Sequence, residues 1–386
     1  MSGGAGGHPD EPLRVLLIVH QLYPGAPSVP LDAFDSLKKS TELRTVALSG
    51  GVLEERYRRL GRVDVVPGWD TSLHRRLRRR WFLRRLGRRL VKFRPHLVYV
   101  NSIVTLPAAR RLPLPNVPLL LHVHELESLV EPVMAANAQL FEWPSRYVAV
   151  SDAVRGVLVN RVGIPKERVA LVHEFIRDDV LSPTVPRTEL HIDTTPKPFV
   201  VGGAGYPSWR KGITLWLQMA AALRRLAPEL PVEFRWVGMV DNERAHAARL
   251  QAKKLGVDGI VNFIPHTERA LDEYRRFDVF AMTSWEDPCP LVVLENMALG
   301  KPVVCFAGGG GAPEEVGNSG VIVPDFDPQM MAAAVVDLAR NSTRREALGR
   351  EARSRVERMF VASVLAPRLL EEMRSVAATK AMARKP

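Results

Sequence analysis

Acidic residues flank an apolar run in the segment SWEDPCPLVVLENMALGKPV, residues 284–303. Glu286 and Asp287 precede the run, and Glu295 follows it. The preceding VFAMTS is typical of a buried strand, so WEDPCP is expected to be the loop at its carboxyl end. Carboxylates in such a loop and in the following helix can accept hydrogen bonds from pairs of sugar hydroxyls. The alternative is that all three are ordinary solvated acids.

A helix is expected directly after this loop. Pro290 and Leu291 suit its first turn, and Gly300 suits its end. The free N–H groups and the positive dipole end of such a helix favour a phosphate.

Two further strand-end loops contain glycines or cations. The segment GGAGYPSWRKG, residues 202–212, contains Gly203, Arg210 and Lys211, and FAGGGGAPEEVG, residues 306–317, contains Gly310 and Gly311. Glycines let a backbone approach a ligand closely, and two cations can neutralise a diphosphate. The first of these loops fits neither GxxxxGK[ST] nor GxGxxG. The convergence of three such loops favours a binding site over chance.

In the first half of the chain, HVHE at residues 122–125 also follows an apolar run. His122 and His124 could hydrogen-bond a reacting group, or could be structural histidines or half of a metal site. A metal needs further ligands at workable spacing, and the sequence offers none, so no metal is expected. Gly25 lies in the first strand–helix loop and is expected to face the floor of a cleft.

Short apolar runs alternate with helix-like segments along most of the chain. The runs are LRVLLIV, RTVAL, VDVVP, HLVYVNS, VPLLLHVH, RYVAVS and RVALVH, and later PFVVGGAG, VEFRWVG, GIVNFIP, VFAMTS, PVVCFA and GVIVP. Buried strands that alternate with helices predict parallel sheets covered on both faces. The fold class is therefore α/β, with two doubly wound domains in tandem and a ligand at the strand ends, in the cleft between them.

Composition changes divide the chain into five parts. A polar, Gly-rich N-terminus without an apolar core is expected to be a disordered tail rather than a secretory signal. The Pro/Thr-rich stretch before PFVVGGAG is the expected linker. The expected ranges are a tail at 1–12, a first domain at 13–180, a linker at 181–197, a second domain at 198–358 and a helix at 359–386 that could cross back to the first domain.

The overall composition is that of a globular protein, with 46% hydrophobic and 25% charged residues among 386. No apolar stretch approaches the ~20 residues of a membrane span. Cys289 and Cys305 are the two cysteines and have no metal-ligand spacing. Reduced thiols in a cytoplasmic protein are expected.

The net charge of +12 is concentrated in the segment at 73–92, which is rich in arginine. Leu73, Leu77, Trp81, Leu86 and Leu90 recur at steps of four and five, which predicts one apolar face of a helix. Its arginines could dock on an anionic membrane surface, or could simply be solvated. No nucleic-acid-binding motif or interleaved aromatic platform accompanies them, which disfavours a nucleic acid.

WEDPCPLVVLENMALGKPVV followed by GGAPEEVGNSGVIVPDFDP resembles the motifs of the retaining glycosyltransferases of family 4, which have the two-domain GT-B fold. RKG and AVSDAVRGVLVNRVGIPKERVALVH add to the resemblance, which covers nearly all of the chain from about residue 13. It implies that Glu295 holds the ribose of a nucleotide-sugar donor and that Glu286 or Asp287 holds the donor sugar.

The same resemblance implies roles for other positions. Lys211 and Arg210 would bind the diphosphate, with Gly25, Gly310 and Gly311 near the donor, and His124 or its neighbour His122 would lie beside the reacting bond.

Four departures from the family's pattern stand out. The separation in sequence between Asp287 and Glu295 matches the family's separation between its two acids, whereas the separation between Glu286 and Glu295 is one residue longer. Either Asp287 therefore takes the first acidic role, or the loop bulges. GAPS, HEFI and GGAG replace the usual first loop, the usual end of the first domain and the usual Gly-Arg element, which gives Arg210 more weight.

A transferase that moves a sugar from a nucleoside-diphosphate sugar to an acceptor hydroxyl is therefore expected, with retention by front-face attack and without a metal or other cofactor. The acceptor class stays open among glycans, lipids and small molecules. A nucleotide-sugar epimerase of the same fold and a non-catalytic binding or membrane-docking paralogue are the alternatives.

Overall fold

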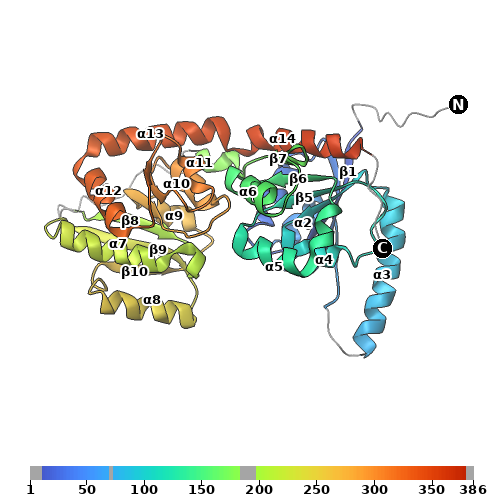
Figure 1. The fold of residues 1–386 in the computed structure, drawn as a ribbon, viewed down its shortest axis with the longest axis horizontal. Coiled ribbons are helices and arrows are strands. Elements are labelled where there is room, and N and C mark those ends of the chain that lie inside the picture. The colour runs from blue at the N-terminus through green and yellow to red at the C-terminus, as the bar shows by residue number, and fades with distance from the viewer. Residues whose placement is uncertain (1–10, 69–72, 183–196, 380–386) are drawn as a thin grey trace. The chain divides into compact units, whose positions relative to one another are not determined.

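The computed structural model describes residues 11–68, 73–182 and 197–379, with side chains of α3 described from Arg79 onward. The predicted tail at 1–12 and linker at 181–197 lie largely outside these ranges. Contacts divide the chain into two compact units, which are described separately. Unit 1 comprises residues 1–173 and 362–386, and unit 2 comprises residues 174–361 (Figure 1).

Unit 1 is built on a seven-stranded parallel sheet in the order β3-β2-β1-β4-β5-β6-β7. The pairing of β1 with β2 runs in register from Leu13 opposite Thr41 to Val19 opposite Ala47. The strands are β1 (Leu13–Val19), β2 (Thr41–Ala47), β3 (Gly61–Val65), β4 (Leu97–Asn101), β5 (Leu119–Val123), β6 (Arg146–Ala149) and β7 (Val169–Leu171). Because β1, β4 and β5 are covered on both faces, their apolar runs are almost wholly buried, as the sequence predicts.

Helices connect these strands. They are α1 (Ser28–Ser36), α2 (Glu54–Leu60), α3 (Leu73–Phe93), α4 (Leu106–Ala109), α5 (Glu127–Asn137) and α6 (Asp152–Gly156). A further helix of this unit, α14 (Ala362–Ala377), follows the last strand of the chain. The helix α14, from the C-terminal part of the chain, packs on α1, β4 and β5 of unit 1. Arg146 of β6 anchors α14 through an ion pair of 2.8 Å between its Nε and a carboxylate oxygen of Glu372.

Unit 2 repeats this architecture with a six-stranded parallel sheet in the order β10-β9-β8-β11-β12-β13. Its strands are β8 (Phe199–Ala204), β9 (Val232–Met239), β10 (Val261–Pro265), β11 (Val279–Met282), β12 (Val303–Phe306) and β13 (Val321–Val323). Its helices are α7 (Ile213–Leu226), α8 (Glu243–Lys254), α9 (Ala270–Tyr274), α10 (Leu291–Ala298), α11 (Ala312–Val316), α12 (Pro328–Arg340) and α13 (Ser342–Met359). Both sheets are doubly wound, as predicted.

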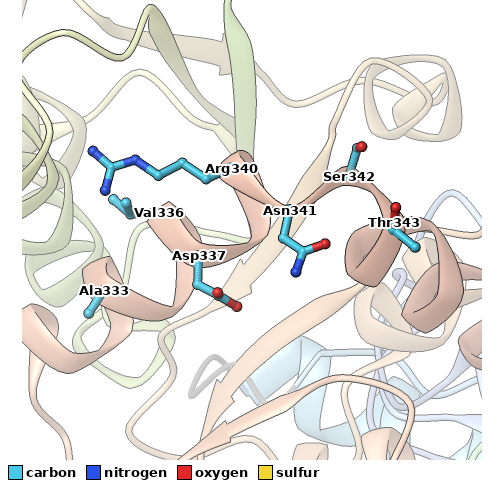
Figure 2. A pocket seen from close by; sticks show the side chains of 7 residues that line it. All are labelled: Ala333, Val336, Asp337, Arg340, Asn341, Ser342 and Thr343. Carbon is cyan, nitrogen blue, oxygen red and sulfur yellow. The ribbon is translucent and has the colours of Figure 1, made fainter.

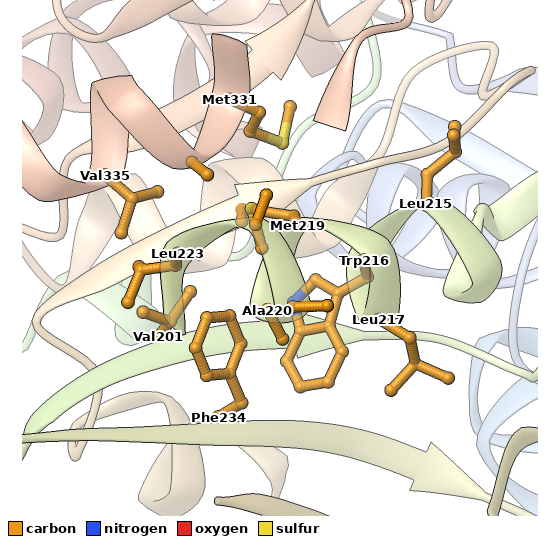
Figure 3. Close-up of a cluster of buried hydrophobic side chains, with 14 of the residues drawn as sticks. Val201, Leu215, Trp216, Leu217, Met219, Ala220, Leu223, Phe234, Met331 and Val335 are labelled. Carbon is orange, nitrogen blue, oxygen red and sulfur yellow. The ribbon is translucent and has the colours of Figure 1, made fainter. Parts of the chain in front are cut away.

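The core of unit 2 forms between its sheet and the helices α7 and α12 (Figure 3). Trp216 of α7 is fully buried and packs edge-on against Phe234 and Trp236 of β9, with ring centroids 5.2 and 5.4 Å apart. Met331 and Val335 of α12 close the cluster from the side of that helix. Burial of these aromatic and aliphatic side chains is the main stabilising contribution that fixes α7 on the sheet.

Local signals place the helix ends. Asn242 caps α8, because its Oδ1 accepts hydrogen bonds from the N–H groups of Arg244 and Ala245 at 3.0 and 3.1 Å. Asp327 caps α12 in the same way through Gln329 N–H at 2.7 Å, with Pro328 in the first turn. Among the described residues, no helix has both the length and the apolarity that a membrane span requires.

One expectation about α3 was wrong. Leu86 and Leu90 are buried, as predicted, but Trp81 is 61% exposed and lies off the apolar face. At 100° per residue, Trp81 stands about 140° around the helix from Leu86. The side chains of Leu73 and Leu77 lie outside those described.

Candidate functional site

The predicted ligand loops of unit 2 meet where the strand order of its sheet reverses. β8 and β11 are neighbours at this point, and their chain connections run to opposite sides. The loops that follow them, 205–212 and 283–290, are joined by a hydrogen bond of 2.8 Å from Trp285 N–H to the carbonyl of Arg210. Open α/β sheets bind ligands at this topological position.

Gly212 allows the two loops to touch. Its φ is +66°, and a Cβ at this position would lie 1.8 Å from the carbonyl oxygen of Thr283. No side chain fits there, so glycine is required both for the backbone conformation and for the close approach. This contact sets the position of Lys211, the preceding residue.

Lys211 forms an ion pair with Asp287, with 2.5 Å between Nζ and Oδ2. The side chains are 21% and 8% exposed, respectively. The backbone of Asp287 also binds the third loop, because its N–H donates to Gly309 at 2.9 Å and its carbonyl accepts from Gly311 N–H at 2.9 Å. Gly310, between these two, has φ +101°. Asp287 thus connects all three predicted loops.

Glu295 lies on α10, close enough to Lys211 for the ammonium group to act on its carboxyl. Burial raises the pKa of Glu295 to about 7, and the charge of Lys211 partly opposes this shift. The residue as a whole is half-buried. Pro290 precedes α10 as its N-terminal cap rather than standing inside it, and Leu291 is its first residue.

The two neighbouring acids differ in their surroundings. Asp287 is buried and tied to Lys211 and two glycines, whereas the side chain of Glu286 is half-buried and more accessible. Glu286 N–H also donates to the carbonyl of Arg210, at 3.4 Å, so the backbone of Glu286 takes part in the contact between loops 205–212 and 283–290.

The segment 202–212 is not a loop throughout, contrary to the prediction. Gly203 lies inside β8, where a Cβ would come within 2.6 Å of the indoles of Trp216 and Trp236. Its small size therefore serves core packing. Arg210 lies in the turn Trp209–Lys211 and is half-buried.

The predicted histidines of unit 1 lie at its own reversal point, where β1 and β4 are neighbours and β5 follows. His124 comes just after β5 and is 7% exposed. Its Nε2 lies 2.9 Å from Asn101 Oδ1, and Asn101 Nδ2 donates to the carbonyl of Ala26 at 3.1 Å. Because the Asn101 oxygen can only accept, His124 Nε2 carries the hydrogen.

His122 is a core residue of β5. It is 1% exposed, its Nδ1 is hydrogen-bonded to the Tyr99 hydroxyl, and burial lowers its pKa well below the ordinary value. Its ring lies against that of His124, with centroids 4.2 Å apart. The structure thus brings the two histidines together but leaves only His124 at the end of the strand.

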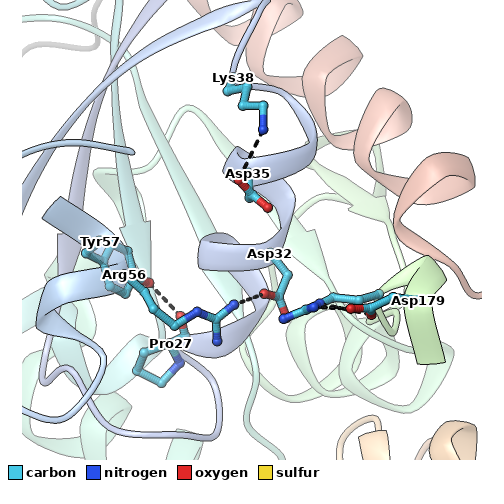
Figure 4. A network of polar contacts seen from close by, with 8 residues as sticks. Pro27, Asp32, Asp35, Lys38, Arg56, Tyr57 and Asp179 are labelled. Carbon is cyan, nitrogen blue, oxygen red and sulfur yellow. Dashed lines mark hydrogen bonds and ion pairs between the residues drawn. The ribbon is translucent and has the colours of Figure 1, made fainter. Parts of the chain in front are cut away.

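Gly25 lies in the loop after β1 with φ +116° and open space around its Cβ position. Neighbouring contacts hold this loop (Figure 4). The Tyr57 hydroxyl donates to the carbonyl of Pro27 at 2.5 Å, and Arg56 pairs with Asp32 of α1 at 2.8 Å. The same loop is joined to His124 through Asn101, as described above.

Besides Asn101, sequence reasoning missed two groups of unit 1. Glu125 is 5% exposed and accepts hydrogen bonds from Ser102 and from the N–H groups of Ile103 and His124, the last two at 3.0 Å. His20 follows β1 as His124 follows β5, and burial lowers its pKa against the opposing charge of Glu125. Its place at a strand end could have identified it.

A buried carboxylate of unit 2 was also missed. Glu315 of α11 is fully buried, accepts a hydrogen bond from the Cys289 thiol at 3.1 Å and has its pKa raised well above the ordinary value, chiefly by burial. Asp287 adds to this shift. The doublet PEE gives no sign of which glutamate faces inward.

A hollow of about 490 Å³ lies elsewhere in unit 2, where α12 meets α13 (Figure 2). Arg340, Asn341 and Thr343 line it, but none of the predicted site residues does. Arg340 is paired with Glu229, and Asp337 with Arg344. These charges are thus engaged within the protein, and the strand ends remain the better candidate site.

In the ranges that the structure describes, no three His, Cys, Asp or Glu side chains are grouped as a metal site requires. At the candidate site, Lys211 pairs with Asp287, and its charge acts on the carboxyl of Glu295.

Comparison with known proteins relates both units to one family. Residues 37–180 match the profile described as "Glycosyltransferase Family 4", and residues 195–341 match "Glycosyl transferases group 1". A D-inositol 3-phosphate glycosyltransferase of Kineococcus radiotolerans is 29% identical over 239 residues, which is 57% of this chain and 54% of that protein. Spore coat protein SA of Bacillus subtilis is 38% identical over 91 residues, 22% of this chain and 24% of that one. The chain spans about half the length of the first of these relatives.

Solved structures share the fold over nearly the full length. Anabaena Alr3699/HepE in complex with UDP and glucose superposes with a TM-score of 0.79 at 18% identity, covering 94% of this chain and 100% of that one. The lipopolysaccharide glycosyltransferase WaaG gives a TM-score of 0.71 at 15% identity, covering 93% and 99%. With the two profile matches and these paired doubly wound sheets, the chain belongs to the group 1 glycosyltransferases of family 4 and has the GT-B fold.

Proposed function

We propose that the protein transfers a sugar from a nucleoside-diphosphate sugar to an acceptor hydroxyl. The observation that carries this proposal is the grouping of Lys211, Asp287 and Glu295 with the loop of Gly310 at the reversal point of unit 2. A cation beside a carboxylate with a raised pKa suits a ligand that presents both phosphates and hydroxyls.

The donor would be held mainly by unit 2. As the glycosidic bond breaks, negative charge grows on the diphosphate, and Lys211, Arg210 and the N-terminus of α10 would stabilise that charge. Glu295 would accept hydrogen bonds from the ribose hydroxyls. Because Asp287 is buried and Glu286 is the more accessible of the two acids, Glu286 would be the acid that contacts the donor sugar.

In unit 1, His124 would hydrogen-bond the transferred sugar near the reacting bond. Asn101 would position it, because the hydrogen bond to Asn101 fixes the ring and its tautomer. His122, inside the sheet, would support the ring of His124 rather than contact substrate.

Two finer features belong to the same proposal. Transfer would proceed with retention of anomeric configuration, by attack on the face that the diphosphate leaves. Cationic side chains would balance the leaving group, so activity should persist in EDTA. Loss of activity in EDTA that added Mg²⁺ or Mn²⁺ restores, or an inverted product by NMR, would contradict these features.

Support for a nucleotide-sugar donor comes from the family and from relatives. Solved structures of Alr3699/HepE contain UDP, UDP with glucose, or UDP-glucose, although the likeness to them is one of fold. Curated relatives are named D-inositol 3-phosphate glycosyltransferases, which makes phosphorylated polyols one acceptor class to test.

A thermal-shift screen of the full chain against UDP-, GDP- and ADP-sugars tests the proposal, since a bound donor raises the melting temperature by mass action. The stabilising donor is then incubated with candidate acceptors, and release of the nucleoside diphosphate is measured. Release that depends on both acceptor and Glu295 supports transfer. Stabilisation by a donor without release on any acceptor favours a binding paralogue, and release of an epimerised nucleotide sugar favours an epimerase.

A further inference from the structure

The outer face of α3 is basic and carries exposed apolar side chains. In Figure 1 this helix runs along the margin of unit 1. Trp81 and Val91 are 61% and 65% exposed. We call this surface the α3 basic face; its exposed members are Arg80, Trp81, Arg84, Arg85, Arg88, Val91 and Lys92. At 100° per residue they cover less than half of the helix circumference.

The opposite face fixes the helix to unit 1. Leu86 and Leu90 are fully buried, and a Cβ at Gly87 would lie 3.2 Å from the ring of Pro113. Arg89 pairs with the buried Asp64 at 2.9 Å, and Asp64 also pairs with Arg44 at 2.6 Å. One arginine therefore has a structural partner, whereas the exposed cations take no part in this packing.

Within the described ranges, these exposed cations also lack the ion-pair partners that cations on other solvent-exposed helices have. Arg58 and Arg59 of α2 pair with glutamates four residues earlier, and Arg353 of α13 pairs with Glu357. From residue 71 to residue 124 the sequence contains no Asp or Glu. Accordingly, no described residue forms an ion pair with Arg80, Arg84, Arg85, Arg88 or Lys92. The charged side chains of the α3 basic face are therefore all positive.

The exposed Trp81 side chain is a second feature that favours a membrane surface. An indole exposed among cations is unfavourable in water but suits the boundary between lipid headgroups and acyl chains. The guanidinium of Arg85 lies 4.4 Å from the Trp81 ring centroid, so the ring is held within the basic surface. A nucleic acid would instead need several aromatic platforms or a groove reader, and α3 offers one indole.

We propose that the α3 basic face docks the protein on an anionic phospholipid membrane surface. The cations would attract the negative headgroups, each changing affinity by about fivefold, and Trp81 and Val91 would enter the interface. Binding would be reversible and sensitive to salt, since surface attraction is screened within about 8 Å at physiological ionic strength. This inference rests on α3 alone and does not depend on the proposed transferase activity.

The test is co-sedimentation of the full chain with vesicles of phosphatidylcholine containing phosphatidylglycerol, and with vesicles of phosphatidylcholine alone. We expect binding to the anionic vesicles only, and its loss at high salt. Replacing Arg84, Arg85, Arg88 and Lys92 by Gln should weaken it by more than about tenfold. Trp81→Ala should weaken it further without altering the charge.

A matched control removes the same charge elsewhere. Arg224 and Arg225 of α7, with Lys253 and Lys254 of α8, are also exposed and form no ion pair within the described ranges, and replacing them by Gln should change binding by less than about twofold. All of these positions are exposed, and circular dichroism checks that both variants stay folded.

Equal loss in the two quadruple variants would show an effect of net charge alone and would overturn the proposal. Equal binding to neutral vesicles would also overturn it, as would wild-type binding that salt leaves unchanged. Tight binding of an RNA or DNA duplex, lost only in the α3 variant and without vesicle binding, would assign the surface to nucleic acid instead.

Discussion

Glu295 and Lys211 determine the electrostatics of the candidate donor site. Burial raises the pKa of Glu295 to about 7, so near neutral pH its carboxyl is divided between both protonation states. Lys211 favours the ionised form but is itself bound to Asp287 at 2.5 Å. A ligand that donates hydrogen bonds to Glu295 would complete the ionisation.

Protonation of Glu295 should make stability depend on pH. Its pKa in the folded protein, about 7, lies above the reference value of 4.5, so its stabilising contribution is full below 4.5 and is lost as the pH rises through 7. Glu295→Gln keeps a neutral group and should increase the free energy of unfolding at pH 8 by on the order of 2 kcal/mol. At pH 4.5 the gain should be near zero. Urea denaturation at the two pH values measures this; an equal effect at both would contradict it.

The ion pair of Lys211 and Asp287 gives a second prediction. Lys211→Met leaves a carboxylate that is 8% exposed without its cation and should cost about 2–4 kcal/mol in urea denaturation. Lys211→Met with Asp287→Asn removes both charges and keeps the backbone bonds to Gly309 and Gly311, so most of that loss should be recovered. A double variant as unstable as the single one would mean that the pair is not the cause.

The sequence identified some of the site residues but not others. Lys211, Glu295 and His124 lie at strand ends, where their roles follow from topology. The choice between Glu286 and Asp287 could not be predicted, because it depends on the contact of Asp287 with Gly309 and Gly311, which lie more than twenty residues later. Asn101 and Glu125 were missed because they act through backbone groups of other loops.

Loop contacts position this site, and Gly212 provides a test of them. Gly212 and Gly256 have nearly equal φ values, +66° and +67°. A Cβ at Gly212 would lie 1.8 Å from the carbonyl oxygen of Thr283, whereas a Cβ at Gly256 would have no atom within 4 Å. Alanine should cost about 1–2 kcal/mol at Gly256, from backbone strain alone.

At Gly212, alanine should cost clearly more than at Gly256, because the loop must also separate from 283–287. Thermal unfolding of the two variants compares these losses directly. Equal losses would show that the close approach of the two loops does not stabilise the protein.

Strands and helices were largely predictable from local sequence. Each of the apolar runs forms a strand within three residues of its expected bounds, because buried parallel strands must be apolar on both faces. Trp81 was misplaced because the step from 81 to 86 does not keep to one helical face. Gly203 was misplaced because a glycine that makes room for Trp216 looks like a loop glycine in sequence.

The two units share the same architecture. Each has a parallel sheet whose order reverses beside its first strand, and each places its candidate residues in the loops at that reversal. Their tandem arrangement could be predicted from the alternation of strands and helices. The place of the division, after His173, rests on contacts far apart in sequence.

The central claim is that Glu295, in its ionised form, binds a nucleotide-sugar donor in unit 2. Calorimetric titration of the full chain at pH 6 and pH 8, with the donor identified by thermal shift, tests it most directly. Because the pKa of free Glu295 is about 7, the dissociation constant should fall about tenfold from pH 6 to pH 8. Glu295→Gln should bind more weakly and should not show this dependence. A variant that keeps both the affinity and the pH dependence of the wild type would contradict the claim.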